Sequence, residues 1–322
     1  MLNIVLCIDK KYNDVAYLFL HTLLNNVSES IKIFIIHQNK SSFKEYVNLL
    51  EDYTYLNKLY VYEFKEDLSS INEIIHGHVT EATYYRIFLD RYLPDDLDYI
   101  FYVDADIICN QNPTNRLKDE IIKLRKTEYL ISAKTEFKKN KNTKYHFDRL
   151  NLKGQRYFNA GVLCIDYQGW LQSNYPSALR KNIFENQNTL EFWDQDLLNI
   201  AIDGKYQELD ESLNFQVKLG KKDNDMSFEK LFSKEQIKNM TFIHYSGSYK
   251  PWTVRGALSK RSKIYNEAYE DLFKQKYNIV NTWKPAAFGH FFLEGLIKFK
   301  IKNLRHPFAF LKIFITSLIK KN

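Results

Sequence analysis

Two aspartates separated by one residue, Asp104 and Asp106, are the strongest candidates for chemistry in this sequence. They directly follow residues 99–103, an apolar run with the composition of a buried strand. Two carboxylates at the end of a strand can hold a divalent cation against a diphosphate, and hard oxygen ligands of this kind suit Mg²⁺ or Mn²⁺. The pair therefore predicts a metal-dependent site for a phosphorylated ligand.

Spacing alone does not select this pair, because the pattern Asp-x-Asp occurs four times in the chain. The other three pairs are Asp96/Asp98, Asp194/Asp196 and Asp223/Asp225. The first precedes the strand in a turn and the last lies in a charged run, so we expect solvated carboxylates in both. The second is expected at a helix N-terminus, where acidic side chains complement the helix dipole.

His244 offers a further metal ligand, because it ends a short apolar stretch and opens a loop that contains Lys250. An imidazole beside two carboxylates favours Mn²⁺ over Mg²⁺, and Lys250 could reach a phosphate. Taken alone, a single histidine at a strand end is more often a structural residue. The role of His244 therefore depends on the rest of the pattern.

The elements that must position these residues alternate along the chain between short β-branched apolar runs and helical patterns. This alternation predicts an α/β fold with a mostly parallel central sheet. Helices are expected at residues 15–24 and 82–92, and a surface loop at 138–144. In such a sheet, ligands gather at the carboxyl ends of the strands. The expected strands are residues 4–8, 31–36, 59–64, 99–103, 129–133 and 161–165.

Composition excludes several classes of protein. The 322 residues include only 10 glycines, and no glycine-rich phosphate-binding motif occurs. The three cysteines are widely spaced, so we expect neither a disulfide framework nor a CxxC metal site.

The N-terminus has no basic region or cleavage site and is expected to form the first core strand. We therefore predict a cytoplasmic protein.

The C-terminal segment differs from the rest, and we predict a boundary between a catalytic domain (1–255) and a helical, basic and aromatic region (256–322). After residue 290 the chain contains seven Lys and Arg residues but only one acidic residue, Glu294. The final apolar run is shorter than the roughly 20 residues needed to span a bilayer. We expect an amphipathic helix on the inner face of the cytoplasmic membrane. The alternative is a helix packed on its own domain.

Five segments, in the correct order, resemble the glycosyltransferase 8 family, and the bacterial lipooligosaccharide galactosyltransferases within it more closely than glycogenin. Together they are far more specific than any one motif. The segments are residues 78–86, 101–106, 157–162, 193–199 and 244–252. The resemblance implies a single nucleotide-sugar-binding domain of the GT-A type. It also implies a retaining enzyme that moves galactose from UDP-galactose to a cell-surface glycan such as lipooligosaccharide. UDP-glucose as donor and a surface glycoprotein as acceptor remain alternatives.

The resemblance also assigns site residues. It implies Mn²⁺, with Mg²⁺ as a substitute, held by Asp104, Asp106 and His244. Asp194 and Gln195 would act at the sugar ring, and His78 and Gly247 would contact the acceptor. The implied donor site contains Ile8, Asp9, Tyr12, Arg86, Asp104, Ala105, Asn159, Ala160, Asp194, Gln195, Gly247 and Lys250.

Two features of the sequence bear on the acceptor and on a possible nucleic-acid partner. Residues 134–136, Lys-Thr-Glu, stand where the galactosyltransferases of this family carry an aspartate near the acceptor, so the sequence leaves the acceptor open. The net charge of +7 could suggest a nucleic-acid-binding protein, but the catalytic half has mixed charge instead of a basic, aromatic face. We therefore expect no nucleic-acid partner.

Overall fold

A computed structural model describes residues 1–68, 80–186, 189–219, 231–247, 249–253, 256 and 259–274. The chain divides into two compact units, Met1–Asn214 and Phe215–Asn322. The boundary predicted after residue 255 stays a prediction, because most of residues 256–322 lie outside the described part.

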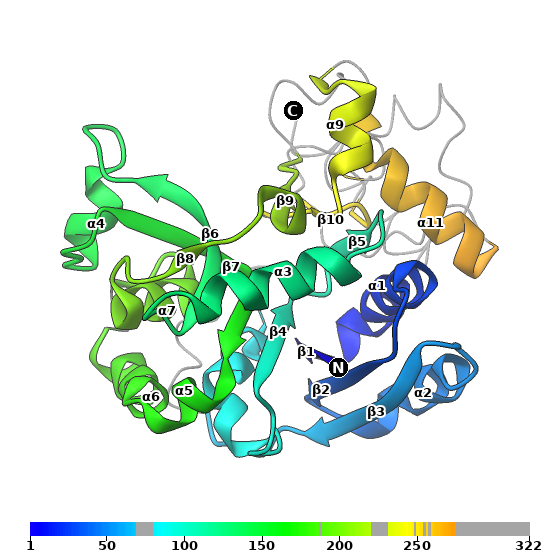
Figure 1. Cartoon of the computed structure of the whole chain (residues 1–322), viewed down its shortest axis with the longest axis horizontal. Coiled ribbons are helices and arrows are strands. Elements are labelled where there is room, and N and C mark those ends of the chain that lie inside the picture. The colour runs from blue at the N-terminus through cyan, green and yellow to red at the C-terminus, as the bar shows by residue number, and fades with distance from the viewer. Residues whose placement is uncertain are drawn as a thin grey trace, which may run out of the picture. The chain divides into compact units, whose positions relative to one another are not determined.

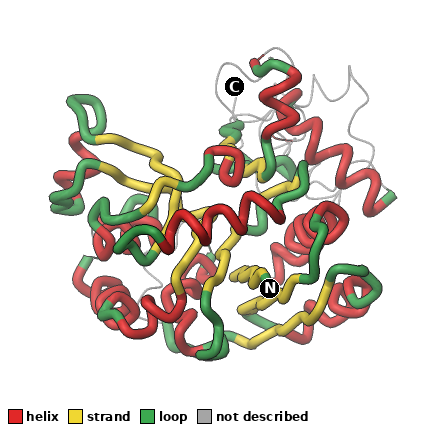
Figure 2. The backbone as a smooth tube through the Cα atoms, viewed as in Figure 1, coloured by secondary structure: helices red, strands yellow, loops and turns green. Residues whose placement is uncertain are grey.

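Among the described residues of the first unit, seven strands form one sheet (Figures 1 and 2). The pairs β1–β2, β2–β3, β1–β4 and β6–β8 are parallel, whereas β7 is antiparallel to β4 and to β6. The predicted α/β fold with a mostly parallel sheet is therefore confirmed. In sheet order the strands are β3 (Leu56–Glu63), β2 (Ile31–His37), β1 (Leu2–Ile8), β4 (Tyr99–Val103), β7 (Arg156–Asp166), β6 (Ile131–Lys138) and β8 (Gln207–Glu208).

The central strands are buried on both faces, as expected for a largely parallel sheet with helices on each side. Along β1, Val5 packs in a large apolar cluster with Phe34 and Tyr102, and the alternate residues Ile4 and Leu6 are also fully buried. Successive side chains of a strand point to opposite faces, so the continuous apolar run supplies both layers of the core.

Helices and short 3₁₀ segments connect the strands, and α3 lies across β7 in the view of Figure 1. The α-helices of the first unit are α1 (Asn13–Asn26), α2 (Lys44–Leu50), α3 (Thr114–Arg125), α4 (Lys144–Arg149), α5 (Tyr167–Gln172), α6 (Tyr175–Glu185) and α7 (Trp193–Ile202). The remaining segments are η1 (Lys10–Tyr12), η2 (Lys40–Phe43), η4 (Glu81–Arg91), η6 (Glu211–Asn214) and the short strand β5 (Ile107–Cys109).

The helix expected at residues 82–92 is the 3₁₀ segment η4, which is kinked at Phe88. It packs against β1, α6 and α7. Seven of its eleven residues are buried, including Tyr84, Tyr85 and Arg86. Runs of 3₁₀ helix of this length are uncommon, and this one is packed on three elements.

Strand β7 begins at Arg156, five residues before the expected start, and it contains a bulge. Ala133 of β6 pairs with Leu163 of β7, but the next residue, Lys134, pairs with Asn159. The extra β7 residues between these pairs bend the strand, and bulges of this kind redirect side chains at functional sites. Ala160 and Gly161 are among these extra residues.

The second unit contains a parallel pair of short strands, β9 (Phe215–Gln216) and β10 (Phe242–His244). Helix α9 (Lys234–Asn239) begins with a capping box made by Ser233 and Gln236. The segment η8 (Lys260–Ser262) leads into α11 (Lys263–Phe273), whose Tyr265 packs edge-on against Tyr245.

No described helix is long and apolar enough to cross a bilayer. The three cysteines are free thiols.

His37, at the end of β2, is buried in its neutral form. The Asn39 backbone N–H donates to its Nδ1 at 2.8 Å, and Nε2 lies 2.8 Å from Asn13 Oδ1, which can only accept. Burial lowers the pKa of His37 to about 4 from an ordinary value of 6.5, although Asp9 and Glu63 act in the opposite direction. A second proton, on Nδ1, would also point at the backbone N–H of Asn39, which disfavours the charged form of His37.

This buried histidine should make the fold sensitive to acid. Between about pH 6.5 and pH 4 the unfolded chain binds a proton that the folded chain does not, so the free energy of unfolding falls as the pH falls. From pH 7 to pH 4.5 we expect His37 to account for a loss of about 1 to 3 kcal/mol. Urea unfolding of the unaltered chain and of His37→Gln at both pH values measures this contribution. If the free energy of unfolding falls equally in both proteins between pH 7 and pH 4.5, His37 is not the source of the acid sensitivity.

Candidate active site

The carboxylates of Asp104 and Asp106 lie at the carboxyl end of β4, where the sequence placed them. The Asp104 backbone N–H donates to the Gly161 carbonyl at 2.8 Å, which fixes the turn after the strand. One carboxylate oxygen of each aspartate lies within 4.8 Å of the other, a separation that one divalent cation can bridge. Ala105, between them, is buried. The two oxygen donors fit a hard cation.

Two of the three competing Asp-x-Asp pairs lie where their contexts predicted. Asp96 and Asp98 are exposed in the turn before β4. Asp194 and Asp196 are buried in the first turn of α7. Asp223/Asp225 lies outside the described residues.

Arg86 links the β4 carboxylate to α7 and β7. Its guanidinium contacts Asp104 Oδ1 at 2.7 Å and Asp194 Oδ2 at 2.8 Å. A third bond, of 2.6 Å, goes to the carbonyl of Ala160. The guanidinium also lies 4.1 Å from the ring centroid of Tyr102, whose hydroxyl donates to Asp104 Oδ1. Groups from η4, β4, β7 and α7 therefore meet at the buried guanidinium of Arg86.

The electrostatics of this group follow from its burial. Only 8% of the Arg86 side chain and 7% of the Asp194 side chain are exposed, so neither charge is well solvated. Burial raises the pKa of Asp194 to about 7, and the positive charge of Arg86 counteracts this rise. The Asp194 carboxylate therefore depends on Arg86 to remain charged near neutral pH.

The side-chain amide of Gln195 is held by four neighbours. Its Oε1 accepts from the Ala160 backbone N–H at 3.0 Å and from Asn159 Nδ2 at 3.2 Å. Its Nε2 donates to the Tyr157 hydroxyl at 3.3 Å and to Glu136 Oε2 at 3.4 Å. Asn159 also donates to Glu136 at 3.1 Å. Polar groups of β6, β7 and α7 thus converge beside the small residues of the β7 bulge.

The end of β1 carries the residues that the resemblance assigns to the nucleotide. Ile8 and Asp9 are buried, and the ring of Tyr12 is partly buried. Asp9 caps η1 by accepting the backbone N–H groups of Lys11 and Tyr12. Burial and the nearby Asp106 carboxylate raise the pKa of Tyr12 above its ordinary range. The Tyr12 hydroxyl therefore stays protonated.

The remaining candidates belong to the second unit or lie outside the described residues. His244 is buried at the end of β10. Gly247 has a φ of +91°, a conformation that strains other residues, and Lys250 Nζ donates to the Tyr245 carbonyl at 2.9 Å. His78 lies outside the described residues.

Several residues of the site were not among the sequence-based candidates. Tyr102, which orients Asp104, lies within a segment that carries the family resemblance, as does Asn199, which bonds both backbone groups of Phe158. Arg149, which binds Asp196, lies in no such segment. Its partner is 47 residues away, and no local pattern predicts that contact.

A mostly parallel sheet with paired carboxylates at the end of a central strand is the arrangement that the resemblance to the glycosyltransferases implied. The profile of Glycosyl transferase family 8 matches residues 3–255. The chain therefore belongs to this family and is a retaining glycosyltransferase, as the resemblance implied.

Individual relatives agree with this assignment. Over 277 residues, 84% of this chain and 78% of the relative, the chain is 25% identical to a lipopolysaccharide 1,2-glucosyltransferase of Escherichia coli strain K12. It is 28% identical over 185 residues to a lipopolysaccharide 1,3-galactosyltransferase of Salmonella typhimurium strain LT2, covering 55% of this chain and 51% of that protein. Galactosyltransferase LgtC, solved with donor and acceptor sugar analogs, has the same fold. Its TM-score is 0.65 at 16% identity, over 89% of this chain and 99% of LgtC.

Removal of the Arg86 charge should destabilise the first unit strongly. Arg86→Met keeps much of the side-chain volume but leaves the Asp104 and Asp194 carboxylates without their shared cation, which costs about 3 to 5 kcal/mol. Urea unfolding measures this loss. The matched control is Arg91→Met, in the same η4 segment, where an exposed ion pair with Glu66 contributes about 1 kcal/mol or less. Equal effects of the two changes would contradict the role assigned to Arg86.

Proposed function

We propose that this protein transfers galactose from UDP-galactose to a cell-surface glycan, with retention of configuration and with a divalent cation. The observation that carries the proposal is the buried Arg86, which joins the Asp104 carboxylate to Asp194 at the start of α7. The carboxylate proposed to bind the cation and the carboxylate proposed to act at the sugar ring are thereby paired with one side chain. The same fold and mechanism with UDP-glucose is the second candidate.

The proposed cation ligands are Asp104, Asp106 and His244. Two carboxylates and an imidazole suit Mn²⁺, and Mg²⁺ would substitute. When bound, the cation would neutralise negative charge on the departing UDP. Lys250 is proposed to assist at the phosphates. The uracil and ribose would lie against Ile8, Asp9 and Tyr12 at the end of β1.

In the proposed reaction, the bond from the anomeric carbon to the UDP oxygen breaks and a bond to an acceptor hydroxyl oxygen forms. UDP leaves with the electron pair of the broken bond, and its phosphate oxygen takes the proton that the acceptor hydroxyl loses. Retention by two successive displacements would need a nucleophile on the opposite face of the sugar. The groups of α7 suit that role poorly, because Gln195 is a neutral amide and Asp194 is paired with Arg86.

We therefore favour attack by the acceptor on the face that UDP leaves, through an oxocarbenium-like state. Gln195 and Asp194 would position the ring and stabilise positive charge on it. Isolation of a glycosyl adduct on either residue would contradict this mechanism.

The acceptor is proposed to be a lipooligosaccharide-like glycan, as the names of the relatives suggest, with a surface glycoprotein as the alternative. His78 and Gly247 are the proposed acceptor contacts. Lys134, Thr135 and Glu136 on β6 differ from the expected aspartate, so the acceptor sugar is expected to differ as well. The proposed catalytic domain is residues 1–255, close to the 3–255 matched by the family profile.

The purified protein should release UDP slowly from UDP-galactose in the presence of Mn²⁺ without any acceptor. Chelation of the metal should abolish the release, and Asp104→Ala and Asp106→Ala should each reduce it at least a hundredfold, because each removes a metal ligand. A coupled assay measures the UDP that is released, and the rate from UDP-galactose is compared with the rate from UDP-glucose.

Asp96→Ala and Asp98→Ala are the matched controls, since they remove an Asp-x-Asp pair that is exposed and lies outside the site. Both should keep the activity of the unaltered chain. Release from UDP-glucose alone would favour the second donor, and a folded protein that does not bind UDP would overturn the proposal.

The C-terminal residues 275–322 lie outside the described part, and their sequence supports a separate proposal. The protein is proposed to be cytoplasmic, with its basic, aromatic tail on the anionic inner face of the membrane. Replacing Lys312, Lys320 and Lys321 by Gln removes three positive charges, each worth about 1 kcal/mol near such a surface. Binding of the full chain to vesicles that contain phosphatidylglycerol should weaken about a hundredfold.

Vesicle cosedimentation measures this change, with vesicles of phosphatidylcholine alone as the uncharged surface. The control triple variant replaces the exposed Lys138, Lys141 and Lys144 in the same way. If both triple variants bind equally well, the tail is not the membrane-binding segment.

A further inference from the structure

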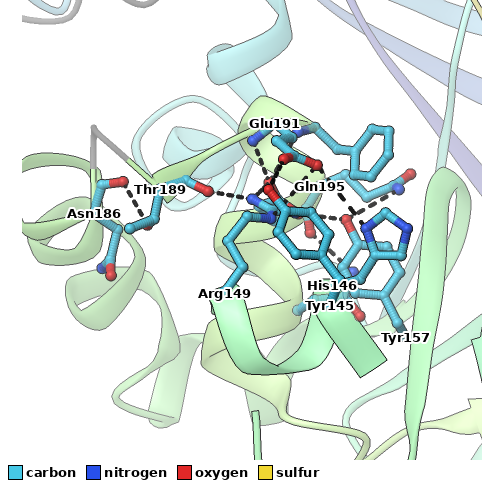
Figure 3. A network of polar contacts seen from close by, with 11 residues as sticks. Tyr145, His146, Arg149, Tyr157, Asn186, Thr189, Glu191 and Gln195 are labelled. Atoms are coloured by element: carbon cyan, nitrogen blue, oxygen red, sulfur yellow. Dashed lines mark hydrogen bonds and ion pairs between the residues drawn. The ribbon is translucent and has the colours of Figure 1, made fainter. Parts of the chain in front are cut away.

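A buried carboxylate at the start of α7 is bound by five donors, although the mechanism above does not use it. Arg149 donates to both oxygens of Asp196, at 2.8 and 3.2 Å. The backbone N–H groups of Glu191 and Phe192 donate to its Oδ2 at 2.7 and 2.8 Å, and the Tyr157 hydroxyl donates to Oδ1 at 2.6 Å. Figure 3 shows this network. Asp196 is fully buried and cannot reach a substrate.

The Tyr157 hydroxyl contacts both this carboxylate and the amide of Gln195. An ionised carboxylate only accepts hydrogen bonds, so the hydroxyl proton must point to Asp196. The lone pairs of the hydroxyl oxygen then face Gln195 Nε2, at 3.3 Å. Burial raises the pKa of Tyr157 well above its ordinary range, so the hydroxyl keeps its proton.

The opposite side of the Gln195 amide is fixed in the same manner. A backbone N–H can only donate, so the group that faces Ala160 must be the carbonyl oxygen of Gln195. Rotation of the amide by 180° would bring Nε2 against the Ala160 N–H and Oε1 against the Glu136 carboxylate. Ala160, Glu136 and Tyr157 thus define a single orientation of the amide.

We propose that Tyr157 is a positioning residue for the transfer reaction, which holds the Gln195 amide in its working orientation through the anchored carboxylate of Asp196. The inference rests on the proposed function, in which Gln195 acts at the sugar ring. Tyr157 is fully buried, so its effect on the reaction is transmitted through Gln195. A side chain that is held in one orientation contributes less to the reaction rate when that orientation is no longer fixed, even if the side chain remains in the site.

A purely structural role for Tyr157 makes a different prediction. Its ring packs in an apolar cluster with Phe147, Leu150 and Leu152, and phenylalanine would preserve that packing. If packing were its whole role, Tyr157→Phe would change stability alone. If the hydroxyl positions Gln195, the turnover number falls while the protein remains folded.

The test compares Tyr157→Phe with Tyr167→Phe by metal-dependent UDP release from the donor that the unaltered chain uses. Tyr167 is a matched control, because its hydroxyl is fully buried and donates one hydrogen bond, to the Leu89 carbonyl at 3.2 Å. It follows the other end of β7, whereas Tyr157 is the second residue of that strand. We expect Tyr157→Phe to lower kcat at least tenfold with the donor KM within about twofold, and Tyr167→Phe to leave both nearly unchanged.

A second comparison tests whether the effect passes through Gln195. In a Gln195→Ala background, Tyr157→Phe should not lower kcat further, because residues that act as one unit are not additive. If Tyr157→Phe fails to fold, Arg149→Lys replaces it. That change keeps the charge but loses the two-pronged contact with Asp196, and it should lower kcat at unchanged donor KM.

A kcat for Tyr157→Phe equal to that of Tyr167→Phe would overturn the inference, as would an undiminished effect in the Gln195→Ala background. Either result leaves the proposed function standing, because the unaltered chain still releases UDP. Absence of metal-dependent release by the folded, unaltered chain from both donors contradicts the proposed function instead, and the positioning role falls with it.

Discussion

The ion pairs of Arg86 with Asp104 and Asp194 are the interaction on which the arrangement of the site depends. Two carboxylates in a nearly dry environment would repel one another, and burying either alone is costly. One guanidinium forms ion pairs with both acids and also donates a hydrogen bond to the Ala160 carbonyl. The carboxyl end of β4 is thereby tied to the start of α7.

A second set of contacts holds the neighbouring amides. The bulge in β7 brings Asn159 and the backbone of Ala160 to the side chain of Gln195. Asn199, one turn further along α7, bonds both backbone groups of Phe158, so the helix is fixed to the bulged strand. A rigid amide positioned by backbone groups is suited to stabilising charge without reorganising during a reaction.

Much of this could be predicted from the chain. The apolar run before Asp104 predicted a strand that ends in a carboxylate pair, and β4 ends at Val103. The same reasoning assigned the exposed Asp96 and Asp98 to a turn, and Asp194 to a helix N-terminus. The 3₁₀ form of η4 and the early start of β7 were not predicted, because packing on several elements determined them and local propensity did not.

By itself, the sequence determined the class of fold, the strand that presents Asp104 and the family. These follow from periodicity and from short motifs, which are local properties of the chain. Only the tertiary structure decided which groups face one another. Arg86 meets Asp194 across more than a hundred residues, and Tyr157 joins Asp196 to Gln195 across nearly forty. Hydrogen bonds and buried ion pairs depend on distance and direction in space, and a polar residue carries no local signal of the partner that burial will require of it.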